Sequence, residues 1–205
     1  YAELIETGIA KPEDTPGFAR KIHVEASRMI QLVNDILQLS HLDNVSETGA
    51  APAMETVDLL DVARECVERQ KVNARHSYIS LTYLGESAPV TGSRVLLDEL
   101  CQNLCDNAIR YNRPGGKVQI ITACTRDGHC TLTVKDNGIG IPKEAQTSVF
   151  ERFYRVDKSR SKATGGTGLG LAIVKHIARI HNARIKLDSV VDEGTTITVI
   201  FETAS

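Results

Sequence analysis

The stretch ELCQNLCDNA at residues 99–108 decides the fold, because it predicts a helix with one polar face set into an apolar pattern. Asn103 and Asn107 are four residues apart, so both amides face the same way. The leucines and the alanine around them follow a core-facing pattern, which disfavours the alternative of two solvated surface asparagines. An amide oxygen can bind Mg²⁺ without adding a full negative charge. The asparagines are therefore candidate metal ligands beside a phosphate-bearing molecule.

Two glycine clusters follow this helix. DNGIG at residues 136–140 comes after an expected strand, where the Asp136 carboxylate can accept the exocyclic amine of adenine. Gly138 and Gly140 permit the backbone to approach a flat ligand closely. GGTGLGL at residues 165–171 runs into an apolar helix, and helix N-termini hold phosphates. Together with the asparagine helix, the two clusters predict an ATP site.

The second cluster differs from the two common phosphate-binding motifs. It lacks the Gly-Lys-Ser/Thr of a P-loop, and it has neither the spacing nor the preceding strand of a dinucleotide fingerprint. The polar, basic residues 157–164 before it suggest a lid that closes over the phosphates, with Arg155 nearby. A disordered surface loop is the alternative, and both descriptions can hold when no nucleotide is bound.

Composition restricts the classes of function. The 205 residues suit one domain or one domain with an appendage. A net charge of -2 gives no basic excess for nucleic acid, and no apolar run is long enough to cross a membrane. We expect a cytoplasmic protein with no nucleic-acid partner. The five cysteines form no Cys-x-x-Cys pair, so we expect small buried thiols in a reducing compartment.

The front of the chain predicts a partial helical hairpin over residues 1–43 and a linker over 44–53. Residues 17–43 form its long helix, whose apolar residues alternate three and four apart in a heptad seam. This seam comprises Ile22, Ala26, Met29, Val33 and Ile36. We predict that it pairs with a second copy in a four-helix bundle. Packing of the helix on its own downstream domain is the alternative.

Residues 54–205 predict a second unit of mixed helices and strands. Helices are expected at 59–71, 94–111 and 168–181, and strands at 54–58 and 79–84. Two β-hairpins are expected, one over 118–125 and 130–135 and one over 184–190 and 195–201. Strands and helices are segregated along the chain, so we predict an α+β fold. It would be a two-layer α/β sandwich, a mixed sheet with helices on one face, preceded by the partial hairpin.

In this order and spacing the motifs resemble those of the cytoplasmic catalytic core of bacterial two-component sensor histidine kinases. Residues 99–111 resemble the N box, 136–140 the G1 box, 150–155 the F box and 166–171 the G2 box. Residues 194–196 resemble the third glycine element. Each box alone is a common pattern, whereas all of them in sequence are specific. The resemblance covers nearly the whole chain.

The resemblance implies an ATP-binding sandwich with Mg²⁺ as cofactor. Asp136 would bind adenine, Asn107 would bind Mg²⁺ with Asn103 beside it, and basic groups would lie near the phosphates. The implied nucleotide-binding set is Asn103, Asn107, Arg110, Tyr111, Asp136, Gly138, Ile139, Gly140, Arg155, Thr167, Gly168, Leu169, Gly170, Leu171 and Thr196. The implied partners are a response-regulator receiver domain and a second copy of the chain. A membrane-anchored parent protein is also implied.

The sequence departs from that family at the phosphoacceptor. In the family, this histidine is followed by an acid and then by Leu-Arg-x-Pro, and none of the six histidines here has that context. We therefore expect the acceptor to lie outside this chain, assign no catalytic residue, and expect no autophosphorylation.

Position 103 bears on the type of reaction. Gyrase- and chaperone-type relatives are expected to carry a glutamate base there, whereas Asn103 cannot accept a proton. Phosphoryl transfer is therefore favoured over hydrolysis. An anti-sigma-type serine kinase, a structural module with a degenerate site and a standalone ATPase are the rivals.

Overall fold

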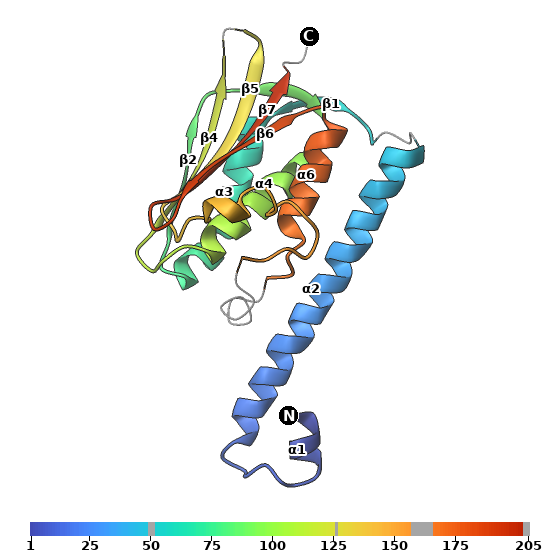
Figure 1. The fold of residues 1–205 in the computed structure, drawn as a ribbon, viewed down its shortest axis with the longest axis vertical. Coiled ribbons are helices and arrows are strands. Elements are labelled where there is room, and N and C mark those ends of the chain that lie inside the picture. The colour runs from blue at the N-terminus through green and yellow to red at the C-terminus, as the bar shows by residue number, and fades with distance from the viewer. Residues whose placement is uncertain (49–51, 126, 157–165, 203–205) are drawn as a thin grey trace.

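The computed structural model describes residues 1–48, 52–125, 127–156 and 166–202. A sheet and three helices form one α/β unit, and a long helix runs along its side and extends away from it (Figure 1). The helices are α1 Ala2–Glu6, α2 Thr15–Thr48, α3 Leu59–His76, α4 Arg94–Arg110 and α6 Gly170–Ile180, with a short 3-10 turn at Lys143–Ala145. The strands are β1 Glu55–Asp58, β2 Ser80–Gly85, β3 Pro89–Gly92, β4 Lys117–Cys124, β5 His129–Asp136, β6 Arg184–Val190 and β7 Gly194–Glu202.

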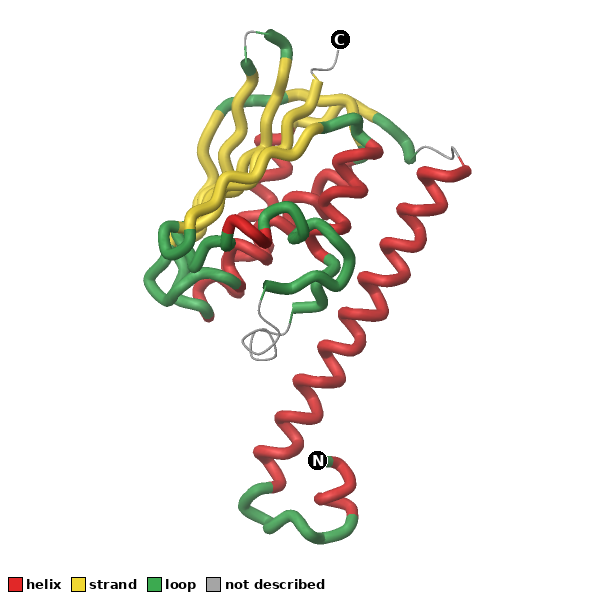
Figure 2. Tube along the Cα trace, viewed as in Figure 1, coloured by secondary structure: helices red, strands yellow, loops and turns green. Residues whose placement is uncertain are grey.

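The main sheet is mixed, as the sequence predicts. Within the described ranges its strand order is β2-β4-β5-β7-β6, with β2 parallel to β4 and the other neighbours antiparallel. Helices α3, α4 and α6 cover one face (Figure 2). This confirms the two-layer sandwich and both hairpins. β1 and β3 pair separately as a small antiparallel ribbon, and the sequence analysis did not identify β3.

The three covering helices form the core against the sheet. α4 buries Leu97, Leu100 and Leu104 on the same side as Cys101 and Cys105. Each fully buried leucine stabilises the fold by about 1.5–3 kcal/mol relative to its exposed state. The polar face of α4, with its two asparagines, is left at the edge of this core, and the helix position is therefore fixed by packing behind the site.

The long helix α2 differs from its prediction in length and in packing. It continues to Thr48 instead of ending at Asp43, because residues 44–48 contain neither glycine nor proline and Gly49 is the first helix-breaking residue. Part of the expected linker at 44–53 is therefore helical, and residues 49–51 lie outside the described part. The domain boundaries at 43/44 and 53/54 otherwise stay predictions.

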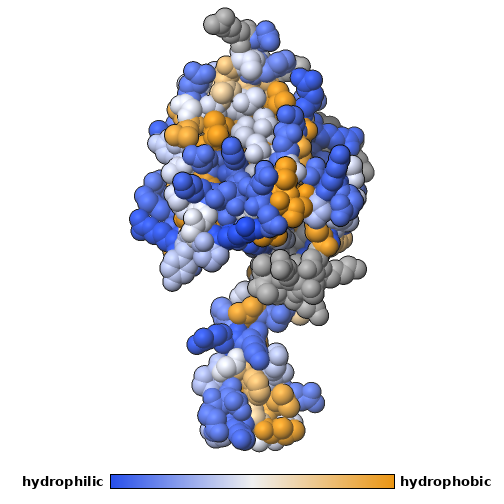
Figure 3. Space-filling view, turned by 60° about the vertical axis from the view of Figure 1, so that its left-hand side comes forward, coloured by the Kyte–Doolittle hydropathy of each residue, from blue (hydrophilic) through white to orange (hydrophobic). Residues whose placement is uncertain are grey.

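The packing of α2 on its own domain, which the sequence analysis ranked second, is present. Leu39 and Leu42 are 4% and 1% exposed and join the main core, and α2 packs against α6. Much of the seam is open to solvent, with Met29 and Val33 65% and 54% exposed. Figure 3 shows further apolar side chains at the lower end, over α1 and the start of α2. Self-association through this surface stays a prediction.

The expectation of five free thiols is wrong for two of them. Cys124 and Cys130 form a disulfide across the tip of the β4–β5 hairpin. The two residues lie directly opposite in the register, with a Cα–Cα distance of 4.1 Å, and the sequence pattern alone did not reveal that pairing. Cys66, Cys101 and Cys105 are free and buried, as expected.

Within the described residues, no helix combines the length and apolar character that a membrane span requires.

Candidate functional site

A cavity of about 1260 Å³ opens between α4, the start of α6 and the loop after β5. It brings together most of the residues that the sequence singles out. These are Asn103, Asn107, Arg110, Tyr111, Asp136, Ile139, Gly140, Arg155, Thr167, Gly168, Gly170 and Leu171. Gly138, Leu169 and Thr196 do not line it. Residues 157–165, which include the expected basic lid, lie outside the described part of the chain.

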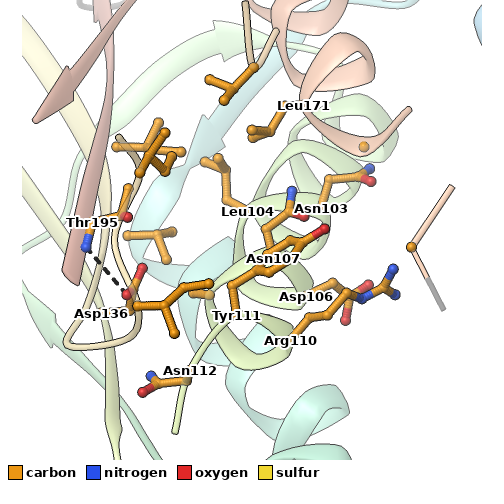
Figure 4. A pocket seen from close by; sticks show the side chains of 18 of the residues that line it. Asn103, Leu104, Asp106, Asn107, Arg110, Tyr111, Asn112, Asp136, Leu171 and Thr195 are labelled. Carbon is orange, nitrogen blue, oxygen red and sulfur yellow. Dashed lines mark hydrogen bonds between the residues drawn. The ribbon is translucent and has the colours of Figure 1, made fainter. Parts of the chain in front are cut away.

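The two asparagines of α4 face the start of α6. Figure 4 shows them on one side of the helix, with Arg110 and Tyr111 further along and Asp136 across the cavity. The side-chain amide of Asn103 donates to the carbonyl of Glu99 over 3.0 Å, which leaves its oxygen for the cavity. A Cβ on Gly170 would lie 3.0 Å from Asn103 Oδ1 and 3.4 Å from Asn107 Nδ2. A glycine here lets both amides approach the N-terminus of α6.

The N-terminus of α6 can hold an anion. No side chain caps it among the residues that the structure describes, and its free N–H groups and dipole favour negative charge. Gly168 has a φ of +77°, the left-handed conformation that favours glycine. The carbonyl of Gly168 accepts a hydrogen bond from the Phe153 backbone over 2.9 Å, so the glycine segment is held against the segment that contains Phe153.

Basic and hydroxyl groups lie beside this N-terminus. A Cβ on Gly166 would be 2.8 Å from Arg110 Nη1 and 3.3 Å from Tyr111 Oη, so both groups approach the glycine segment. Arg155 also lines the cavity. A guanidinium next to a helix N-terminus is a suitable environment for phosphate oxygens.

Asp136 lies across the cavity at the end of β5. Its Oδ1 accepts a hydrogen bond from the N–H of Gly138 over 2.8 Å. The same oxygen accepts one from the N–H of Thr195 over 3.3 Å (Figure 4). Burial raises the pKa of Asp136, and the two hydrogen bonds oppose that shift. Both described bonds engage the same oxygen, so Oδ2 is left for a ligand. A carboxylate held in this way can recognise an exocyclic amine.

The glycines around Asp136 shape the loop after β5. A Cβ on Gly138 would collide with the carbonyl of Tyr111, and one on Gly140 would collide with the carbonyl of Val190. The N–H of Ile139 donates to the Tyr111 carbonyl over 3.1 Å. Gly138 therefore packs against the end of α4, and the N–H of Ile139 ties the loop to it.

Thr196 and Leu169 do not line the cavity, and their expected contact with nucleotide stays a prediction. Successive residues of a strand point to opposite faces, and on β7 it is Thr195 and Ile197 that line the cavity. Thr196 lies between them and faces the other side of the sheet. Leu169 is 0% exposed and belongs to the core rather than to the cavity surface. Thr195 was missed, because alternation around the third glycine element does not specify which face of the strand meets the cavity.

Two residues of α2 also line the cavity, namely Gln31 and Asp35. Asp35 is 7% exposed and accepts a hydrogen bond from Thr167 Oγ1 over 2.6 Å. Gln31 donates to its other oxygen, also over 2.6 Å. The sequence pattern predicts that α2 belongs to a separate unit, so it could not assign Gln31 and Asp35 to the site.

The carboxylates of α4 near α2 are electrostatically perturbed. Burial raises the pKa of Glu99 to about 7, with an opposing hydrogen bond from Gln38 and a further rise from the charge of Asp35. Burial also raises the pKa of Asp106, whose Oδ1 accepts a 2.5 Å hydrogen bond from Gln70. No cluster of acidic, histidine and cysteine side chains in the described ranges could hold a metal ion by itself. A metal here would depend on amide oxygens and on the ligand's own phosphates.

Comparisons with known proteins identify the family. Residues 92–205 match the family model described as histidine kinase-, DNA gyrase B-, and HSP90-like ATPase. The sensor-like histidine kinase SenX3 of Mycolicibacterium smegmatis is 42% identical over 203 residues. The match covers 97% of this chain and 51% of SenX3, so the chain spans about half the length of that relative.

Solved structures show the same fold. A mycobacterial sensor histidine kinase, MprB, has a TM-score of 0.63 and 32% identity over 73% of this chain and 97% of its own. The Acinetobacter baumannii histidine kinase AdeS has a TM-score of 0.74 at 22% identity over 100% of this chain and 92% of its own, which is a likeness of fold alone. With the family model covering more than half of its residues, the chain belongs to the histidine kinase-, DNA gyrase B- and HSP90-like ATPase family.

Proposed function

We propose that this chain is the ATP-binding core of a two-component sensor histidine kinase, which transfers the γ-phosphate of Mg-ATP to a histidine. The observation that carries the proposal is the cavity, which places Asp136 at one side and the N-terminus of α6, with Asn103 and Asn107, at the other. The sensor kinases among the relatives support the reaction type.

The residues suit the parts of ATP. Asp136 Oδ2 would accept the adenine amine, and the free N–H groups at the start of α6 would hold phosphates. Arg110, Tyr111 and Arg155 would complement the phosphate charge. The oxygen of Asn107, with Asn103 beside it, would bind Mg²⁺, which neutralises phosphate charge when present.

The amide at position 103 supports transfer rather than hydrolysis. Asn103 cannot take a proton from water, and its N–H is used within α4. Glu99, one turn earlier, lies outside the cavity lining and faces Gln38 and Asp35 of α2 instead. The same amide disfavours the anti-sigma-type serine kinase, for which a glutamate is expected at this position.

The transfer needs an acceptor and a receiver. None of the six histidines has the acceptor motif, so the phosphorylated histidine would lie outside this chain. The phosphate would then pass to an aspartate of a response-regulator receiver domain. The exposed seam of α2 would pair with a second copy, and the unit would act in the cytoplasm.

Isothermal titration calorimetry with Mg-ATP tests the proposal. The chain should bind one nucleotide, and Asn107→Asp should weaken binding at least about tenfold, because it adds a negative charge beside the phosphates. Asn182→Asp is the matched control, since Asn182 lies in the turn before β6 and does not line the cavity. Equal affinities for the wild type and Asn107→Asp would refute the assignment of the site.

A further inference from the structure

The carboxylate of Asp35 lies at the phosphate end of the cavity although it belongs to α2. Its hydrogen-bond donor Thr167 is three residues before Gly170, where α6 begins. At 7% exposure the carboxylate is largely shielded from water. The two donors that hold it, Gln31 and Thr167, are neutral, so they fix its position without cancelling its charge.

The charge of Asp35 lies beside the groups that would hold phosphates. Asp35 and its hydrogen-bond donor Thr167 both line the cavity, together with Gly168 and Gly170 at the start of α6. A largely buried carboxylate at this position will disfavour a phosphate, because the interaction is poorly screened in a partly buried site. Repulsion should grow with the number of phosphate groups.

The position of Asp35 depends on the docking of α2. In the next two turns of α2, Leu39 and Leu42 are buried in the core. Asp43, which follows them, contacts Arg152 and His176. As long as this face is docked, Asp35 stays in the cavity wall. If α2 moves away, the carboxylate leaves with it.

We propose that Asp35 is a residue of the nucleotide site that selectively weakens the binding of phosphate-bearing ligands while α2 is docked. This inference rests on the proposed ATP site. Docking of α2 would then weaken the binding of nucleotide, and bound nucleotide would weaken the docking of α2. The two effects are equal in size, because a coupling between two equilibria acts in both directions. The helix that is expected to mediate self-association would thereby also set the affinity for ATP.

The test compares adenosine, ADP and ATP by calorimetry on the whole chain and on Asp35→Asn. The variant keeps an oxygen that accepts from Thr167 and removes the charge, and the Gln31 amide can turn so that its own oxygen accepts from the new Nδ2. It should bind ATP about 5- to 20-fold more tightly, with a smaller gain for ADP and none for adenosine. Glu25→Gln removes one negative charge from the exposed part of the same helix and should leave all three affinities unchanged.

The outcomes separate this inference from the proposed function. If the wild type binds none of the three ligands, the nucleotide site itself is refuted. If ATP binds both proteins equally, or binds Asp35→Asn more weakly, the site survives but the role of Asp35 is refuted. Retained adenosine affinity shows that the variant is folded, and Asp35→Ala repeats the comparison with a smaller side chain.

Discussion

Asp43 of α2 accepts hydrogen bonds from Arg152 Nη2 at both carboxylate oxygens, over 2.8 and 2.9 Å, and its Oδ1 lies 2.7 Å from His176 Nε2. Arg152 lies in the segment before the cavity-lining Arg155, and Asp35, eight residues before Asp43, contacts Thr167. Two carboxylates on one face of α2 therefore contact the ATP-binding unit at both Arg152 and Thr167. These contacts connect α2 to the nucleotide site.

Asp43→Asn should loosen α2 without changing a cavity residue. The hydrogen bond from Arg152 lowers the pKa of Asp43, so its carboxylate is charged and paired at neutral pH. Because the pair is partly exposed, its loss should cost only about 0.5–1 kcal/mol. In Asp43→Asn, hydrogen exchange of the backbone amides of residues 31–43 should accelerate and the affinity for ATP should rise. Asp14→Asn, at an exposed position directly before α2, is the control and should change neither quantity. Unchanged exchange in Asp43→Asn would show that this contact does not hold the helix.

Glu99 should make the stability of the chain depend on pH. Its folded pKa of about 7 lies above the ordinary glutamate value of 4.5, so the unfolded state loses the proton first as pH rises. The resulting loss of folding stability is absent below about pH 4.5, grows between about pH 4.5 and pH 7, and is complete above about pH 7. Allowing for partial exposure, it should amount to on the order of 1–2 kcal/mol at pH 8.

The Glu99→Gln variant provides the measurement. Urea unfolding at pH 5.5 and pH 8 should show that the substitution removes part of the loss in stability seen for the wild type over that range. Glu68→Gln, at an exposed position on α3, serves as control and should keep the full pH dependence. If Glu99→Gln and the wild type lose equal stability between the two pH values, the buried carboxyl is not the source.

Gly168→Ala should impair the phosphate end of the site. The residue has a φ of +77°, and a Cβ would lie 3.1 Å from the Phe153 backbone. We expect a loss of about 1–2 kcal/mol in stability from the left-handed backbone and at least a tenfold loss in ATP affinity. Gly115→Ala is a matched control, since it has a φ of +83° with nothing within 4 Å of a Cβ. It should lose stability alone; an equal loss of ATP affinity in both variants would contradict the role of Gly168.

Removal of the disulfide should affect stability and not the site. Cys124 and Cys130 pair at the tip of the β4–β5 hairpin, whereas Asp136 pairs with Val118 at its other end. The bridge closes a short loop, so Cys124→Ser should cost about 2 kcal/mol at most. Thermal melts should show the loss, and ATP titration should give the wild-type affinity. A large loss of affinity would mean that the hairpin tip and the site are coupled.

The sequence predicts the parts of this molecule that depend on local pattern. The two hairpins and α4 follow from alternation and helical spacing, and Asn103 and Asn107 lie on the expected face. The four-residue β3 was missed because so short a strand carries little periodic signal and pairs with β1, which is remote in sequence. Which of Thr195 and Thr196 faces the cavity depends on the orientation of β7 in the sheet, and the glycine motif alone does not specify that orientation.

The remaining differences come from long-range packing. The contact between Asp35 and Thr167 joins residues 132 positions apart, and nothing in the α2 pattern distinguishes a docked acid from a solvated one. The disulfide likewise required knowledge that Cys124 and Cys130 lie opposite one another. Such pairings become visible only when the fold has placed the elements together.

The most direct measurement is a crystal structure of the chain with Mg²⁺ and a non-hydrolysable ATP analogue. We expect the adenine amine on Asp136, the phosphates at the start of α6 and the metal on Asn107, all within one nucleotide-filled cavity. A nucleotide bound elsewhere, or one that contacts Asp136 while Asn107 and the start of α6 face a different space, would contradict this account of the site.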